Sequence, residues 1–113
     1  MQSVEKLLDE LPSAFGWSPG DVRKNLTASP AHRKLVMLGR NSPKALTYMV
    51  ALIDEWAQEG EPENDLSAVG LFLALTDVDR CLALVLADEV SHSSLYWTSW
   101  FAGSYVLKCY LEA

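Results

Sequence analysis

LSAVGLFLAL, at residues 66–75, is the stretch that decides the fold, because it is apolar on every side of a helix. Leucine and alanine dominate it, and both favour a helix over a strand. A helix without a polar face must be surrounded by other elements, since any exposed side would leave apolar surface in water. The sequence therefore predicts that residues 66–75 form the central helix of a helical bundle.

The segments before this stretch carry three Ser-Pro pairs, and each pair predicts the start of a helix. A serine hydroxyl accepts a hydrogen bond from an orphan backbone N–H, and proline is preorganised for the first helical position. The pairs are Ser18-Pro19, Ser29-Pro30 and Ser42-Pro43. We expect helices over 19–26, 30–38 and 43–58, with Gly39 or Asn41 ending the second and Gly60 ending the third.

The two ends of the chain are also predicted to be helical. Ser3 is expected to cap a first helix that either ends near Leu11 or bends there, because Pro12 follows it. A last helix is expected from about Leu95 to Leu111.

Acidic and polar residues bracket the central helix. The segment EGEPEND, residues 59–65, reads as a loop, and its Asp65 is expected to cap the helix over 66–75. The spacing of Thr76 and Asp79 is that of a capping box, which predicts a further helix through about Val90. A single helix over 66–90 stays open as the alternative.

Strands are the competing interpretation for CLALVLA (81–87) and SYVLKCYL (104–111). No Asn-Gly or Asp-Gly hairpin turn separates these runs, and their leucines and alanines favour helix. We therefore predict an all-α fold: a compact single-domain bundle of about five to seven helices over residues 1–113, with an aromatic C-terminal helix.

Composition narrows the class of protein. The chain has 113 residues, of which 50% are hydrophobic and 21% charged, which is enough apolar material for a core. Its two cysteines, Cys81 and Cys109, lie in apolar runs and are expected to be buried free thiols. Charges interrupt the apolar stretches at residues 1–12 and 66–90, and the uncharged stretch at 90–107 is too rich in serine to span a membrane. We expect a soluble, cytoplasmic protein that does not insert into membranes.

The net charge of −6 is unevenly distributed along the chain. Residues 19–44 carry six basic side chains and one acid, a net charge of +5, whereas residues 45–113 carry eleven acids and two basic side chains. The acidic excess disfavours general binding to nucleic acid, which needs a basic footprint. The basic segment 23–44 keeps a nucleic-acid-binding regulator open as an alternative.

No motif in the sequence indicates catalysis or a bound cofactor. The cysteines and histidines lack the spacing of a zinc site, and the glycines are scattered singly rather than gathered in a phosphate-binding loop. His92, between Ser91 and Ser93, is expected to lie in a polar connection, and His32 is expected to be exposed beside Arg33. We expect no enzyme activity, no catalytic residue, no cofactor and no metal.

The last helix is unusually aromatic. Trp97, Phe101 and Tyr105 recur every fourth residue, so they are predicted to share one face. That face either packs into the core or forms part of an interface, because tryptophan and tyrosine are common in binding hot spots. Both possibilities stay open at the level of the sequence.

These features favour a protein-binding module, most plainly a small acidic inhibitor or immunity-type protein that neutralises a toxin or an enzyme. An adaptor or subunit of a larger assembly is the alternative, and a homodimer stays open. The candidate partner-binding residues come from the acidic loop and the aromatic helix: Glu59, Glu61, Glu63, Asp65, Trp97 and Trp100.

Overall fold

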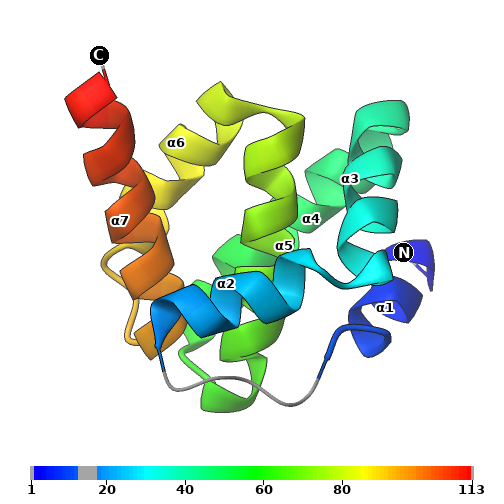
Figure 1. The fold of residues 1–113 in the computed structure, drawn as a ribbon, viewed down its shortest axis with the longest axis horizontal. Coiled ribbons are helices and arrows are strands. Elements are labelled where there is room, and N and C mark those ends of the chain that lie inside the picture. The colour runs from blue at the N-terminus through cyan, green and yellow to red at the C-terminus, as the bar shows by residue number, and fades with distance from the viewer. Residues whose placement is uncertain (1, 13–17, 113) are drawn as a thin grey trace.

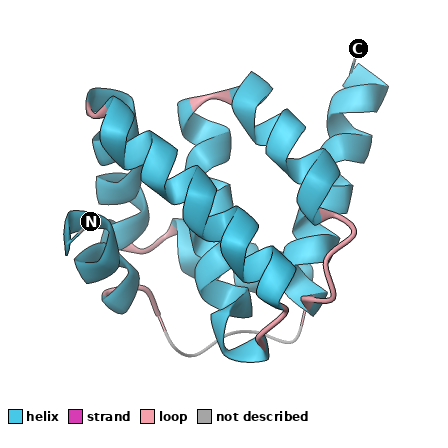
Figure 2. Cartoon of the chain, turned by 180° about the vertical axis from the view of Figure 1, so that it is seen from behind, coloured by secondary structure: helices cyan, strands magenta, loops and turns pink. Residues whose placement is uncertain are grey.

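The computed structural model describes residues 2–12 and 18–112, and within them the regular structure is helical, without a strand (Figures 1 and 2). The elements in the described residues are α1 Gln2–Asp9, α2 Pro19–Thr27, α3 Pro30–Asn41, α4 Pro43–Glu59, the short 3-10 helix η1 Pro62–Asn64, α5 Asp65–Val78, α6 Arg80–Val90 and α7 Tyr96–Glu112. The predicted all-α fold with an aromatic C-terminal helix is therefore confirmed.

The three Ser-Pro pairs start helices as predicted. In each case the serine precedes the first helical residue, and its hydroxyl accepts a hydrogen bond from a backbone N–H of the first turn. The bonds are Asp21 N–H to Ser18 (3.2 Å), Ala31 N–H to Ser29 (3.2 Å) and Ala45 N–H to Ser42 (3.1 Å). Gly60 ends α4 in the left-handed conformation, at φ 68°, which glycine adopts without strain.

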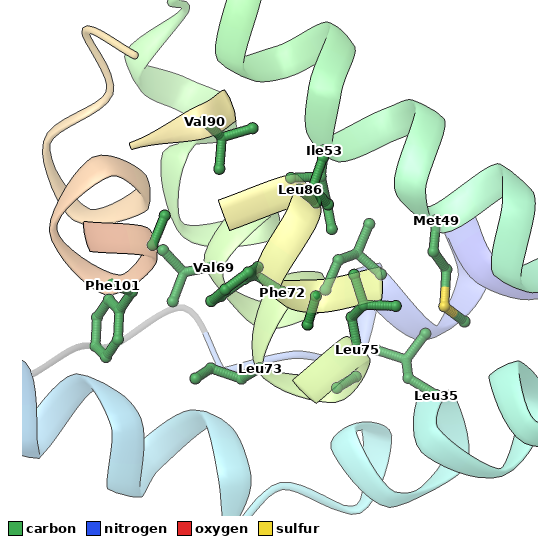
Figure 3. Packing of buried hydrophobic residues seen from close by; sticks show 14 of the residues in the cluster. Leu35, Met49, Ile53, Val69, Phe72, Leu73, Leu75, Leu86, Val90 and Phe101 are labelled. Atoms are coloured by element: carbon green, nitrogen blue, oxygen red, sulfur yellow. The ribbon is translucent and has the colours of Figure 1, made fainter. Parts of the chain in front are cut away.

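Helix α5 occupies the centre of the bundle, as its composition predicts. Eight consecutive residues, Ala68–Leu75, are buried, and α5 packs against each of the six other α-helices (Figure 1). Figure 3 shows Phe72 in the middle of the apolar cluster, with Phe101 of α7 on one side and Leu35 and Met49 on the other. Because α5 is covered on every side, it needs no polar face.

The boundary between α5 and α6 differs from the predicted one. Helix α5 continues to Val78, and Asp79 rather than Thr76 caps α6, accepting a hydrogen bond from the Leu82 N–H at 3.0 Å. The Thr76 hydroxyl instead donates to the Leu73 carbonyl inside α5, at 2.6 Å. The chain over 66–90 thus forms two helices, which removes the alternative of a single one.

Gly39 does not end α3, which runs on to Asn41. Gly39 is buried, and a Cβ atom there would lie 3.0 Å from the Val78 Cγ2 atom of α5. Glycine therefore allows the backbone of α3 to lie close to the end of α5. Of the two predicted ends of this helix, Asn41 is therefore confirmed, and Gly39 serves close helix packing instead.

Helix α1 begins at Gln2, so Ser3 lies inside the helix rather than capping it, and Leu11 follows its end. The expected burial of both thiols was also wrong. Cys81 is exposed on the outer side of α6, and Cys109 is half-buried on α7, with both free. His32, expected to be exposed, is buried, and its Nε2 lies 3.1 Å from the Asp77 Oδ2.

Candidate functional site

The start of α7 is fixed by a buried carboxylate on α5. Asp65 accepts hydrogen bonds from the backbone N–H groups of Trp97 (2.9 Å) and Thr98 (2.8 Å), and from the Thr98 hydroxyl (2.7 Å). These groups belong to the first turn of a helix, where N–H groups lack partners and the helix dipole favours a negative charge. Asp65 therefore caps α7, thirty-two residues away in the sequence, rather than its own helix.

Asp65 is therefore not part of an exposed acidic surface, although the sequence predicts it as a partner-binding residue. Its side chain is buried and its exposed fraction is 7%. All three of the described hydrogen bonds to its carboxylate come from α7, so the group holds two helices together. We therefore leave Asp65 out of the proposed contact surface.

Glu59, Glu61 and Glu63, which we call the acidic loop, are exposed around Gly60 and η1. Partial desolvation, with Glu55 and Glu61 close by, raises the pKa of Glu59. The acidic loop adjoins the start of α7, since Asp65, two positions after Glu63, caps that helix and a Cβ atom on Gly60 would contact the Ser94 hydroxyl. The structure thus brings the acidic loop next to the start of α7, the helix that carries Trp97 and Trp100.

Helix α7 has two different faces. The inward face packs on α5: Phe101 is 1% exposed, and Trp97 and Tyr105 are half-buried against the core. Thr98 and Ala102 are buried on the same side of the bundle. Of the two predicted site tryptophans, Trp97 therefore contributes mainly to packing, while Trp100 is 42% exposed.

The outward face of α7 carries a row of exposed apolar side chains, which we call the α7 stripe. At about 100° per residue, the five positions fall within an arc of about 100° on one side of the helix. The residues and their exposed fractions are Tyr96 67%, Trp100 42%, Leu107 59%, Tyr110 79% and Leu111 74%. Figure 1 shows α7 at one edge of the bundle, opposite α1.

Gly103 lies in the middle of the α7 stripe. A Cβ atom on Gly103 would meet nothing within 4 Å, so this glycine is not required by packing inside the molecule. The α7 stripe therefore has no apolar side chain at position 103, between Trp100 and Leu107.

Sequence reasoning could place α7 and its aromatic residues but not the α7 stripe. Both faces of the helix are apolar, so periodicity alone does not say which face the core covers. Leu107, Tyr110 and Leu111 were therefore missed. Positions 96, 100, 107 and 111 lie on one face of the helix. This spacing predicts an exposed apolar face only when the opposite face is known to be buried.

The basic segment 23–44 is spread over α2, α3 and the first turn of α4, and its cations are exposed. Several of them contact other parts of the molecule. Lys34 lies 3.6 Å from the Glu10 carboxylate, Arg40 donates to the Asp77 carbonyl at 2.8 Å, and Arg23 lies 5.4 Å from the centre of the Phe101 ring. Part of this charge therefore serves contacts within the fold.

The surroundings of His92 do not form a nucleophile–base pair. His92 is exposed, and the flanking serines donate to backbone carbonyls: Ser91 to Asp88 at 3.0 Å and Ser93 to Ala57 at 2.7 Å. Both hydroxyls are thus engaged in shaping the connection between α6 and α7, as expected for a polar loop.

Comparison with known proteins gives no relative: no protein family, curated protein or solved structure matches the chain. Within residues 2–12 and 18–112, no three His, Cys, Asp or Glu side chains lie close enough together to hold a metal ion. None of the described helices has the length and apolar character needed to cross a membrane.

Proposed function

We propose that this protein is a protein-binding module that contacts its partner through the α7 stripe, with the acidic loop beside it. The observation that carries the proposal is the α7 stripe itself. Exposed apolar residues are normal when they are scattered, whereas a contiguous row along one helix is typical of an interaction surface.

The size of the α7 stripe suits an interface. Its five side chains expose from 42% to 79% of their surface. Aromatic and leucine side chains of this kind offer on the order of 600 Å² of apolar area together, close to the roughly 800 Å² that each partner buries in a stable complex. Trp100 and the two tyrosines are of the residue types that dominate binding hot spots.

Charge points to the chemistry of the partner. The acidic loop adds three carboxylates at the start of α7, and the whole chain carries a net charge of −6. Such a surface is complementary to a basic protein that presents an apolar patch next to its cations. We favour a small inhibitor or immunity-type protein that covers a basic surface of a toxin or an enzyme.

Two other functions are the alternatives. An adaptor or subunit of a larger assembly would use the same α7 stripe, and the number of partners in the isolated complex separates it from an inhibitor. A nucleic-acid-binding regulator would use the basic segment 23–44, several of whose cations already contact other groups of the protein. A homodimer formed through α7 would appear as a second copy in sedimentation equilibrium.

Affinity isolation from the native host tests the proposal, using tagged wild-type protein and two variants. The double variant Trp100→Ser and Leu107→Ser removes the centre of the α7 stripe. Met37→Ser is the matched control, since Met37 is a 50% exposed apolar residue on α3. We expect the wild type and Met37→Ser to retain the same protein, and the double variant to lose it. Retention of that protein by the double variant, or its loss from Met37→Ser as well, would contradict the proposal.

A further inference from the structure

We infer that a cleft between α2, α5 and the C-terminal half of α7 binds a small organic anion that carries a flat apolar group. The cleft has a volume of about 610 Å³, within the range of roughly 300–1,000 Å³ that is usual for small-molecule sites. It is separate from the acidic loop but shares Trp100 with the α7 stripe, and the inference does not rest on the proposed protein-binding function.

One part of the cleft lining is apolar and aromatic. Phe72 and Leu73 of α5 line it from the core, and Tyr105 and Trp100 line it from α7. The Phe72 and Tyr105 rings pack edge to face, with centroids 5.6 Å apart and an interplanar angle of 89°. Rings held in this way offer a rigid surface on which a planar group can stack.

Three cations from three helices border the cleft: Arg23 of α2, Arg80 of α6 and Lys108 of α7. Arg80 pairs with the Glu112 carboxylate at 3.1 Å. Arg23 and Lys108 have no carboxylate within 4.0 Å in the described part of the chain, although the Arg23 guanidinium also lies 5.4 Å from the centre of the Phe101 ring. Two basic side chains are therefore available to an anion entering between α2 and α7.

The acids of the cleft are already engaged. Asp77 lies 3.1 Å from the His32 Nε2, and Glu112 accepts from Arg80. These are the two carboxylates among the residues that line the cleft, against three basic side chains. Three basic side chains against two carboxylates leave the cleft with a net charge of +1, although the chain as a whole is acidic.

The Tyr105 hydroxyl supplies a further polar group. It is buried and has no hydrogen-bond partner of good geometry among the described residues, although Arg80 and Cys109 lie close to it. Burial raises the pKa of Tyr105, so the hydroxyl stays protonated and can donate. A buried donor without an acceptor is costly, and an anion in the cleft would offer it one.

The observations together specify the ligand class. A carboxylate or phosphate would lie between Arg23 and Lys108, where charge-assisted hydrogen bonds are strong. A ring-sized apolar group would lie against Trp100, Phe72 and Tyr105. Sequence reasoning missed this site, because its residues come from α2, α5, α6 and α7 and share no local motif.

Isothermal titration calorimetry on the full chain tests the inference, with 1-naphthyl phosphate as the probe. Its neutral counterpart, 1-naphthol, and inorganic phosphate test whether the ring and the charge are both needed, and 1-naphthoate distinguishes a carboxylate from a phosphate site. We expect saturable binding of at least one of the two naphthyl anions, and binding of 1-naphthol and of inorganic phosphate that is at least about tenfold weaker.

Two charge-matched double variants complete the test. Arg23→Gln with Lys108→Gln removes the two unpaired cations of the cleft, whereas Lys24→Gln with Lys44→Gln removes two exposed cations outside it. We expect the first variant to weaken binding of the naphthyl anion at least about tenfold and the second to change it less than about twofold. Circular dichroism confirms that both are folded. The inference is overturned by an absence of saturable binding, by equal binding of 1-naphthol, or by equal losses in the two variants.

Discussion

Replacing Asp65 tests how the fold positions the proposed binding surface. The Asp65→Ala substitution removes a buried carboxylate that accepts three hydrogen bonds from the first turn of α7. The backbone N–H groups of Trp97 and Thr98 then lose their partner in a place that water reaches poorly. Both the cap and the charge that complements the helix dipole disappear.

The expected cost follows from these contacts. Loss of an exposed helix cap costs about 0.5–2 kcal/mol, and a buried donor left without a partner adds about 1–3 kcal/mol. We expect Asp65→Ala to lower the free energy of unfolding by about 3–4 kcal/mol, out of the roughly 5–15 kcal/mol typical of a domain. Asp65→Asn retains one acceptor oxygen and should cost about 2 kcal/mol. Thr98→Val removes only the hydroxyl donor and should cost about 1 kcal/mol.

Urea denaturation followed by circular dichroism and tryptophan fluorescence measures these differences. Glu63→Ala is the control, because Glu63 is an exposed acid two positions from Asp65 and should change stability by less than about 0.5 kcal/mol. The order Asp65→Ala, Asp65→Asn, Thr98→Val, Glu63→Ala is expected, from most to least destabilised. An Asp65→Ala variant as stable as Glu63→Ala would refute the reasoning, since the carboxylate would then not hold α7 in place.

Three further predictions concern the surface and the packing. Changing the three glutamates of the acidic loop to glutamine should slow association with the partner and make the association rate less dependent on salt in stopped-flow kinetics. Thermal stability should not change. Unaltered association kinetics would show that the acidic loop is not part of the contact surface. Gly103→Ala should raise the free energy of unfolding by about 0.5–1 kcal/mol, because the added methyl group meets open space. Gly39→Ala should not raise it, because its methyl group crowds Val78. Equal gains in stability in thermal melts would contradict this packing. Fluorescence anisotropy should show no DNA or RNA binding at physiological salt, and micromolar binding abolished by Arg33→Ala with Lys34→Ala would instead favour the nucleic-acid-binding alternative.

The parts of the fold that depend on neighbouring residues could be predicted from the sequence. The three Ser-Pro pairs act within one helical turn, and Gly60 ends its helix through its own backbone conformation. The central place of α5 also follows from composition, since a helix without a polar face has no other stable position. Thr76 and Asp79 show the limit of such reasoning: either could cap a helix, and only the packing of α5 through Val78 decides between them.

The parts that depend on distant contacts could not be predicted. Asp65 carries the signal of a cap, but its partner is a helix that begins thirty-one positions later. His32 is in a basic segment and is nevertheless buried, with its Nε2 atom 3.1 Å from the Asp77 carboxylate of α5. The α7 stripe and the cleft likewise depend on which face of α7 the core covers.

Site-specific photocrosslinking in the native host tests most directly the central claim that the α7 stripe binds the partner. A benzophenone amino acid replaces Leu107 or Trp100 on the α7 stripe, or Met37 on α3 as the control; all three side chains are exposed. We predict that positions 107 and 100 form a covalent adduct with the same partner protein, of the same mass, and that position 37 does not. An adduct at position 37 alone, or none from either position on α7, would contradict the assignment of the binding surface to α7.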